Sequence, residues 1–510
     1  MFKRIKYTSF LLSGVCLGMN SCAKTPQQEV IPNILFIIAD DISYPFMSAY
    51  GSRMVSTPGF DYVASRGTLF RNAYVTSPGS SPSRASTLTG LFPWQLEEAG
   101  THASSFSAQF ETYPDILVNL GWHVGYTGKG WLPGDWQISG RKNNPAGPEY
   151  NEHQLVPPYS GISRIDYTAN FKAFLETREP GQPFCFWIGT LEPHRPFEKD
   201  SWKKAGLSLE DAEVPGFLPD TEVIRGDLLD FAVEVAWFDS HIVNSINILK
   251  EIGEFDNTII IITGDNGMAF PRAKANLYNA GINVPLAIAW GDNIKPNQVN
   301  EALVSMIDIF PTLMDAIGIE TNVNYVGRSL LPLLRGNDIH RFNTTVFAGR
   351  ERHSYARYNN KGYPMRAAIT EDFMLIHNFH PGRFPAGDPQ EKFEDGTLGE
   401  MHHAYADIDA SPSKDELINN RNNPLIHPYF LAAMGKRPEF ELFCMKTDRD
   451  CMNNLADNSD YAEALAEMKE ILHNKLRETN DSRMGDTPHI WDSYPRLAGR
   501  SRMFPPHSTD

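Results

Sequence analysis

Three stretches of consecutive apolar residues stand out in the first half of the chain, at 34–38, 184–188 and 258–262. None of them alternates apolar with polar positions, so each is typical of a strand buried on both faces. Strands of this kind occur in parallel sheets that are covered by helices. Between the last two stretches, apolar residues recur at helical spacing from Asp227 to Glu251, which predicts an amphipathic helix. The pattern therefore predicts an α/β fold with a mostly parallel sheet sandwiched by helices.

The pattern changes after about residue 340, where apolar runs become short and turn-forming residues frequent, as at 379–395 and 410–423. The last periodic stretch, Tyr461–Thr479, predicts an amphipathic helix. We therefore expect a main domain over residues 30–338, a smaller C-terminal α+β subdomain over 339–485, and a polar tail over 486–510.

Residues 1–22 have the pattern of a secretory signal. A basic head is followed by an apolar stretch from Phe10 to Met19, which is shorter than the roughly 20 residues needed to cross a bilayer. Cys22 follows a small residue and resembles the lipidated cysteine of a bacterial lipobox; cleavage near Ala23 without a lipid is the alternative. We expect an exported bacterial protein that is either periplasmic or anchored to the membrane as a lipoprotein.

Composition narrows the classes of function. The chain has 510 residues, 41% of them hydrophobic and 21% charged, which is typical of a folded protein and excludes a disordered or fibrous one. The net charge of −16 argues against nucleic acid as a partner, and leaves a lipid anchor as the only expected membrane contact. A site for an anionic substrate must therefore be locally basic.

Cysteine usage indicates few structural roles for sulfur. Cys185 lies within an apolar stretch and is expected to be a buried free thiol. Cys444 and Cys451 would close a short loop if they formed a disulfide in an oxidising compartment. No paired spacing suggests a zinc site.

Charged residues follow each of the three apolar stretches. Asp40 and Asp41 come after the first, His194 shortly after the second, and Asp265 and Asn266 after the third. In open α/β sheets, ligands bind beyond the carboxyl ends of the strands. We therefore expect these side chains to meet at one edge of the sheet.

The segment Ser80-Ser81-Pro82-Ser83-Arg84, before a predicted helix that ends in Thr89-Gly90, resembles the sulfatase signature. Four other motifs occur in the order of that family: Asp40-Asp41, Gly125 to Lys129, Pro193-His194, and Asp265-Asn266-Gly267. The resemblance covers most of the chain. It implies an alkaline-phosphatase-like fold and hydrolysis of a sulfate ester or sulfamate.

The resemblance also implies that Ser80 is oxidised to formylglycine (3-oxoalanine) by a formylglycine-generating maturation enzyme. A serine hydroxyl is a poor nucleophile without a base. A hydrated aldehyde offers two hydroxyls on one carbon, one that attacks sulfur and one that later expels sulfate by reforming the carbonyl. A position at a helix start also directs backbone N–H groups at an anion.

One divalent cation is expected, with Asp40, Asp41, Ser80, Asp265 and Asn266 as its ligands. Because these ligands offer only oxygen atoms, Ca²⁺ is favoured, with Mg²⁺ as the alternative. Three cations match the family's sulfate-binding groups, and one histidine matches its general acid. These expected catalytic residues, in addition to Ser80, are Arg84, Lys129, Lys274 and His194.

Two positions depart from the family pattern. Many sulfatases have a histidine two residues after the motif lysine, but Trp131 occupies that position here. The second base is therefore different, absent, or supplied by His102, His123 or His353. Serine in place of cysteine at position 80 implies the oxygen-independent maturation route of serine-type sulfatases.

Longer stretches resemble the heparan N-sulfatase (N-sulfoglucosamine sulfohydrolase) branch, at 265–278, 362–366 and 375–378. The arginine usual in that branch appears here as Lys274, a cation without a bidentate fork. The resemblance implies glycosaminoglycan degradation, with a sulfated saccharide as partner and N-sulfoglucosamine of heparan sulfate as substrate. The residues expected to line the sugar pocket are Arg350, Glu351, Arg352, His353 and Arg366.

Two alternatives stay open. An O-sulfatase acting on another glycan, or a phosphate or phosphonate monoesterase, would use the same metal site. A glycan-binding lipoprotein without activity belongs to a different class, and is suggested by Trp131 and by serine at position 80.

Overall fold

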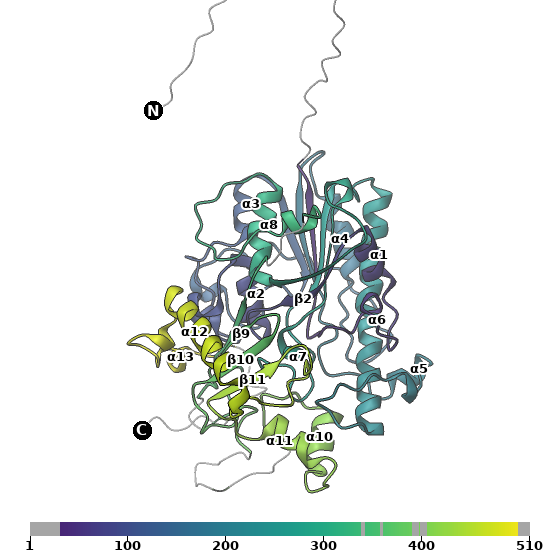
Figure 1. Cartoon of the computed structure of the whole chain (residues 1–510). Coiled ribbons are helices and arrows are strands. Elements are labelled where there is room, and N and C mark those ends of the chain that lie inside the picture. The colour runs from purple at the N-terminus through teal and green to yellow at the C-terminus, as the bar shows by residue number, and fades with distance from the viewer. Residues whose placement is uncertain (1–30, 338–341, 358–360, 390–396, 398–404, 498–510) are drawn as a thin grey trace, which may run out of the picture. The chain divides into compact units, whose positions relative to one another are not determined.

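A seven-stranded sheet is the centre of the computed structural model, which describes residues 31–337, 342–357, 361–389, 397 and 405–497 (Figure 1). The expected signal at 1–22, with Cys22, lies outside the described residues. The strands follow the order β3-β4-β1-β5-β6-β2-β7. Their bounds are β1 Asn33–Ala39, β2 Gly67–Tyr74, β3 His123–Gly128, β4 Phe184–Gly189, β5 Thr258–Gly264, β6 Leu286–Ala289 and β7 Gln298–Ser305.

The three apolar stretches form the adjacent strands β4, β1 and β5. β1 is parallel to both neighbours, with Ile34 opposite Cys185 on one side and Ile259 on the other. Among the described strands of this sheet, β6 alone runs antiparallel to its neighbours. The predicted mostly parallel sheet is confirmed, and the carboxyl ends of β4, β1 and β5 lie side by side.

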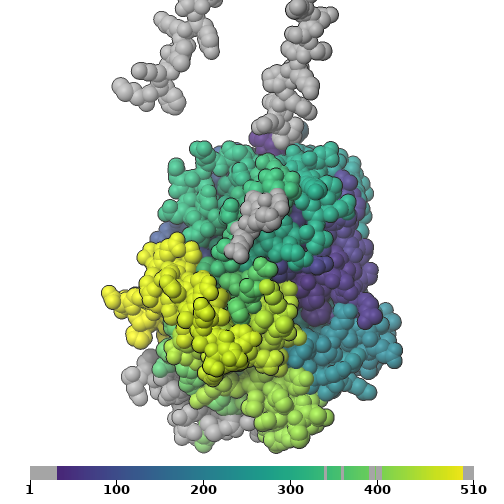
Figure 2. Space-filling view, viewed as in Figure 1, coloured from purple at the N-terminus to yellow at the C-terminus, as the bar shows by residue number. Residues whose placement is uncertain are grey.

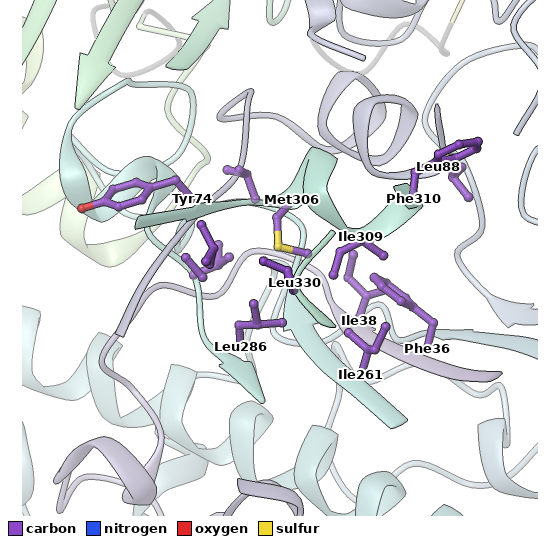
Figure 3. Close-up of a cluster of buried hydrophobic side chains, with 14 of the residues drawn as sticks. Phe36, Ile38, Tyr74, Leu88, Ile261, Leu286, Met306, Ile309, Phe310 and Leu330 are labelled. Atoms are coloured by element: carbon purple, nitrogen blue, oxygen red, sulfur yellow. The ribbon is translucent and has the colours of Figure 1, made fainter. Parts of the chain in front are cut away.

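Helices cover both faces of the sheet, which explains why β1 has no polar position after Asn33. Phe36 and Ile38 face a core shared with α2 (Ser80–Thr89), α3 (Tyr113–Asn119) and α8 (Ile309–Ala316) (Figure 3). Leu35 and Ile37 face a second core, shared with α1 (Pro58–Arg66), α4 (Tyr167–Glu176) and α6 (Glu222–Glu251). The predicted helix at 227–251 is confirmed as α6. It begins at Glu222 because the Thr221 side chain caps it by accepting the N–H of Ile224.

A smaller antiparallel sheet forms the C-terminal part of the chain, in the order β11-β10-β9-β8. The predicted helix at 461–479 is confirmed as α12 (Ala462–Glu478), which packs on β9 and β10. These strands are β8 Val346–Arg350, β9 Met365–Ile369, β10 Phe373–Asn378 and β11 Phe440–Cys444. The remaining helices are α5 Ser201–Lys204, α7 Asn279–Ile282, α9 Leu331–Leu334, α10 Pro412–Asn419, α11 His427–Met434 and α13 Ile490–Ser493.

Two C-terminal segments are more ordered than their polar composition indicates. The turn-rich stretch at 410–423 contains helix α10, because Ser411 caps it and Pro412 occupies its first turn, where turn-forming residues suit a helix start. Within the expected polar tail, α13 buries Trp491 to 2% exposure. Figure 2 shows the C-terminal residues, in yellow, on the surface of the molecule.

Among the described residues, the cysteines form no disulfide. Cys185 is a buried free thiol, as predicted, and Cys444 and Cys451 are separate thiols, so the disulfide considered for this pair is not formed. Cys451 is drawn into the core, where its Sγ lies 3.8 Å from Met374 Sδ. Among the described helices, none is long and apolar enough to cross a membrane.

Candidate active site

Ser80 is the first residue of α2, and its side chain is buried at the carboxyl ends of β1 and β5. Its Oγ donates to Asp40 Oδ1 at 2.9 Å and lies 3.4 Å from Asn266 Oδ1. The Lys129 ammonium, one residue beyond β3, donates both to Ser80 Oγ at 2.9 Å and to Asp40 Oδ2 at 2.6 Å. The structure thus brings residues from three other segments onto the hydroxyl of Ser80.

Three buried carboxylates meet beside Ser80. Oxygen atoms of Asp40, Asp41 and Asp265 lie within 4.8 Å of one another. Asp41 has a left-handed backbone (φ 70°), held by its N–H donating to Asp265 Oδ1 at 3.0 Å. A non-glycine residue in this conformation stores strain, which proteins tolerate mainly where function requires a side chain at a fixed place. Asn266 Nδ2 donates to Asp41 Oδ1, which leaves its Oδ1 on the side of Ser80.

Cations compensate these carboxylates. Arg84 Nε lies 2.9 Å from Asp265 Oδ2, and Lys274 Nζ lies 2.5 Å from Asp41 Oδ2. Burial acts to raise the pKa of Asp40, but Lys129, His194 and Arg84 outweigh it and hold that pKa well below its usual range. Burial and the neighbouring Asp40 raise the pKa of Asp265 to about 7, against the opposing effect of Arg84. The cations beside Asp40 therefore outweigh its burial, whereas those beside Asp265 do not.

His194 follows β4, and its Nε2 lies 3.7 Å from Asp41 Oδ2. Burial and the positive Lys274 lower the pKa of His194 to about 4, although Asp41 opposes them. The ring is therefore neutral at neutral pH in this setting. An anionic substrate beside it would raise its pKa, because a nearby negative charge stabilises the imidazolium.

Trp131 replaces the histidine of the family pattern without opening the site. Its ring is fully buried and its Nε1 donates to Ser81 O at 2.9 Å. Of the three histidines considered as substitutes, His123 lies at the far, amino end of β3 and contacts Phe174 O. His102 and His353 stack with ring centroids 4.3 Å apart, and both line a small pocket with Gly79, next to Ser80.

Four of the five expected sugar-pocket residues line that same pocket: Arg350, Glu351, Arg352 and His353. Arg366 does not line it, but reaches Glu351 Oε1 at 2.7 Å and Asp481 Oδ2 at 2.6 Å. Both oxygens of Glu351 are engaged by arginines, since Arg483 takes the second one at 2.6 Å. Much of this charge is therefore compensated within the protein.

Asp409 belongs to the site but no sequence pattern indicates it. Its Oδ2 lies 3.2 Å from Lys274 Nζ, so Lys274 is held between Asp41 and a carboxylate of the C-terminal part of the chain. The only sequence signal is the Asp407-Ile408-Asp409 repeat before α10, and such acidic turns are common on protein surfaces.

The sheet and the convergence of acidic, cationic and hydroxyl groups at its carboxyl edge define an alkaline-phosphatase-like α/β hydrolase. The model of the sulfatase family matches residues 32–319, and a model described as N-sulphoglucosamine sulphohydrolase, C-terminal, matches residues 272–384. The chain belongs to the sulfatase family, whose members hydrolyse sulfuric esters and sulfamates.

Similar proteins cover nearly the whole chain. Human N-sulphoglucosamine sulphohydrolase is 27% identical over 88% of this chain and 90% of its own length. An N-acetylglucosamine-6-O-sulfatase of Bacteroides thetaiotaomicron is 24% identical over 93% and 92%. A solved protein in complex with its substrate D-glucosamine-2-N,6-O-disulfate shares the fold, with a TM-score of 0.63 and 20% identity over 88% of this chain and 98% of that one. A phosphonate monoester hydrolase of Agrobacterium radiobacter also shares the fold, with a TM-score of 0.62 and 16% identity over 88% of this chain and 96% of that one.

Proposed function

We propose that this protein is an exported sulfatase that removes the N-sulfate from glucosamine units of heparan sulfate, with position 80 as formylglycine. The observation that carries the proposal is the match of residues 272–384 to the N-sulphoglucosamine sulphohydrolase C-terminal model. This segment contains Lys274 of the site and the pocket residues from Arg350 to His353. Human N-sulphoglucosamine sulphohydrolase, similar over most of the chain, supports the same substrate class.

The donor set fits a hard divalent cation. Three buried carboxylates and the Asn266 amide oxygen surround one point with oxygen atoms alone, which favours Ca²⁺ or Mg²⁺. Asp40, Asp41, Asp265 and Asn266 would hold this ion together with residue 80. When bound, it would polarise the sulfate oxygens and acidify the hydroxyls of residue 80.

The chain's own groups supply orientation and proton transfer. Lys129 donates to residue 80, and with Lys274 and Arg84 it provides fixed positive charge where negative charge builds on the sulfate oxygens. Neutral His194 takes up a proton when the anionic substrate binds and delivers it to the leaving nitrogen. The almost complete burial of the site excludes water from these charges and strengthens them.

A sulfated-sugar panel with Ser80→Ala as the control tests the proposal. The protein is made in an anaerobic bacterial host, and mass spectrometry of the peptide around position 80 measures the fraction of serine converted to formylglycine. We expect formylglycine at position 80, release of sulfate from N-sulfoglucosamine, and a loss of at least about a thousandfold in Ser80→Ala. Converted protein that releases sulfate from no sugar, or wholly unconverted serine, contradicts the proposal; the second result favours an inactive glycan-binding protein.

The second candidate is a glycan O-sulfatase or a phosphonate monoesterase. The similarity to an N-acetylglucosamine-6-O-sulfatase and the fold shared with a phosphonate monoester hydrolase favour keeping these activities in the panel. Sugars sulfated at O6 or O3 and a nitrophenyl phosphate are therefore included. Turnover confined to one of these compounds assigns the site to that reaction.

We also propose that the protein is exported and lipidated at Cys22. The basic head and short apolar stretch before Cys22 support export. Labelled fatty acid should be incorporated into the wild type but not into Cys22→Ala. An unlabelled wild type that is still exported would indicate ordinary signal cleavage.

A further inference from the structure

A buried group of three arginines lies at one end of the small sheet, next to the active site. Arg350 ends β8, Arg357 follows it, and Arg437 precedes β11; each is at most 6% exposed. Arg350 and Arg357 place their guanidinium carbons 5.8 and 5.5 Å from the Tyr363 ring. Arg437 stacks on the Tyr278 ring at 4.6 Å.

The group carries more positive than negative charge. Asp407 Oδ2 accepts from both Arg350 and Arg357, while its Oδ1 accepts from Ser354. Glu441, the other carboxylate nearby, accepts from Tyr278 and from Asn378 instead. Within the part of the chain that the structure describes, Arg437 has no carboxylate within salt-bridge distance.

The donors of the group are also incompletely used. All three nitrogens of Arg437, Nη1 of Arg357, Nε of Arg350 and the Tyr363 hydroxyl are buried without a hydrogen-bond partner among the described residues. Stacking on Tyr278 engages the face of the Arg437 guanidinium but none of its in-plane N–H groups. Buried, unpaired charge is costly. Burial and the repulsion from Arg357 and Arg437 lower the pKa of Arg350 to about 10, against the effect of Asp407. Burial also acts to lower the pKa of Arg437, but Tyr278 and Glu441 outweigh it and raise that pKa.

The arginine group adjoins the active site through Arg350. This residue lines the pocket beside Ser80, and its Nη1 donates to the carbonyl of Ala275, the residue after Lys274. Arg350 therefore links the arginine group to the residue that follows Lys274.

We propose that Arg350, Arg357 and Arg437, with the Tyr363 hydroxyl, bind an oxyanion, a sulfate or carboxylate group, at a second site beside the catalytic one. A planar guanidinium presents paired donors that match the two oxygens of such a group. The ligand is either a second acidic group on the saccharide or a free sulfate ion. Only the first source rests on the proposed function.

Thermal unfolding with inorganic sulfate tests the site without turnover. All measurements use a Lys274→Ala background, in which sulfate binding at the catalytic site is weakened. Sodium chloride at equal ionic strength is the reference for each sulfate concentration. We expect sulfate to raise the unfolding midpoint of Lys274→Ala by a few degrees more than that of Lys274→Ala with Arg437→Gln. Arg421→Gln is the matched control, because Arg421 lies just beyond the end of α10 and its Nη1 donates to the carbonyl of Ile418; this variant should keep the full response.

The general stabilising effect of sulfate cancels in this comparison, since all variants experience it. An equal response with and without Arg437→Gln overturns the proposal. If the Gln variant does not fold, Arg437→Lys keeps the charge but loses the fork. The sulfate concentration for half of the effect should then rise severalfold, and an unchanged concentration overturns the proposal equally.

Two pairs of saccharides distinguish the sources of the anion. N-sulfoglucosamine is compared with its 6-O-sulfated form and with a disaccharide that carries a uronate carboxylate. For each pair, the kcat/KM of the doubly charged sugar is divided by that of the singly charged one. If the second acidic group of that pair binds to the arginines, Arg437→Lys should lower this ratio about tenfold. A lost sulfate response with both ratios unchanged assigns the site to the free ion. Failure of every sugar to react refutes the proposed function while the sulfate response still decides this site.

Discussion

Lys274 has three N–H donors, and two of them face carboxylates, Asp41 at 2.5 Å and Asp409 at 3.2 Å. The third remains for a substrate oxygen. Sequence motifs predict Lys274 and Asp41 because both belong to ordered family patterns, whereas Asp409 lies in an acidic turn with no pattern of its own. The candidate site is therefore predictable where its residues belong to ordered motifs, and not where a residue such as Asp409 lies outside any motif.

Asp409→Asn should strengthen product inhibition. Removing this negative charge leaves Lys274 more available to sulfate, and at short range one charge is worth up to a few kcal/mol. We expect the inhibition constant of inorganic sulfate to fall three- to tenfold and kcat to fall with it, as sulfate leaves more slowly. Measured steady-state inhibition that becomes weaker instead would mean that Asp409 mainly positions Lys274.

Glu234 on α6 is a buried carboxyl whose two oxygens have no partner among the described residues. Burial and the neighbouring Glu192 raise its pKa to about 9. Because the folded state holds this proton and the unfolded state releases it near pH 4.5, the group destabilises the protein progressively as pH rises from about 5 to 9.

Glu234→Gln should remove this dependence. Between pH 5 and pH 8, the wild type should lose on the order of 4 kcal/mol of unfolding free energy relative to the variant. Urea unfolding at both pH values measures the difference. Glu251→Gln, at the exposed end of the same helix, keeps Glu234 and should therefore lose as much unfolding free energy between the two pH values as the wild type does.

At the scale of elements, uninterrupted apolar runs made β1, β4 and β5 predictable, since burial on both faces leaves a strong signal. β6 is only four residues long and was not predicted, because a run that short resembles many loops. Helix α10 was not predicted, because Ser411 and Pro412 at its start are residues that are also common in turns. A strand buried on both faces can be predicted from its apolar residues, whereas the formation of a short element depends on the residues that pack against it.

Ser411→Ala tests whether this cap holds α10. The Ser411 side chain accepts the N–H of Lys414, and losing such a cap costs about 1 kcal/mol. Hydrogen exchange should accelerate over residues 412–419, while α12 exchanges as before. Uniform acceleration over both helices would show that α10 opens only with the whole subdomain.

At the scale of the whole molecule, the chain carries a net charge of −16 and still concentrates three buried cations around three buried carboxylates. A divalent cation that binds only the folded protein stabilises it by mass action. We expect Ca²⁺ added to chelator-treated protein to raise the unfolding midpoint by a few degrees, and Asp41→Asn to abolish the rise. A larger effect of Mg²⁺ would reverse the expected choice of ion.

Ser80 is only 2% exposed and starts a helix whose ten residues are all buried. A maturation enzyme must bind the chain on both sides of the serine that it oxidises, and in the folded protein neither flanking segment is accessible. The proposed conversion of Ser80 to formylglycine must therefore occur while the chain is still unfolded, before α2 packs against the sheet. A cell that exports the protein faster than it oxidises Ser80 would accumulate folded molecules that no later encounter can activate.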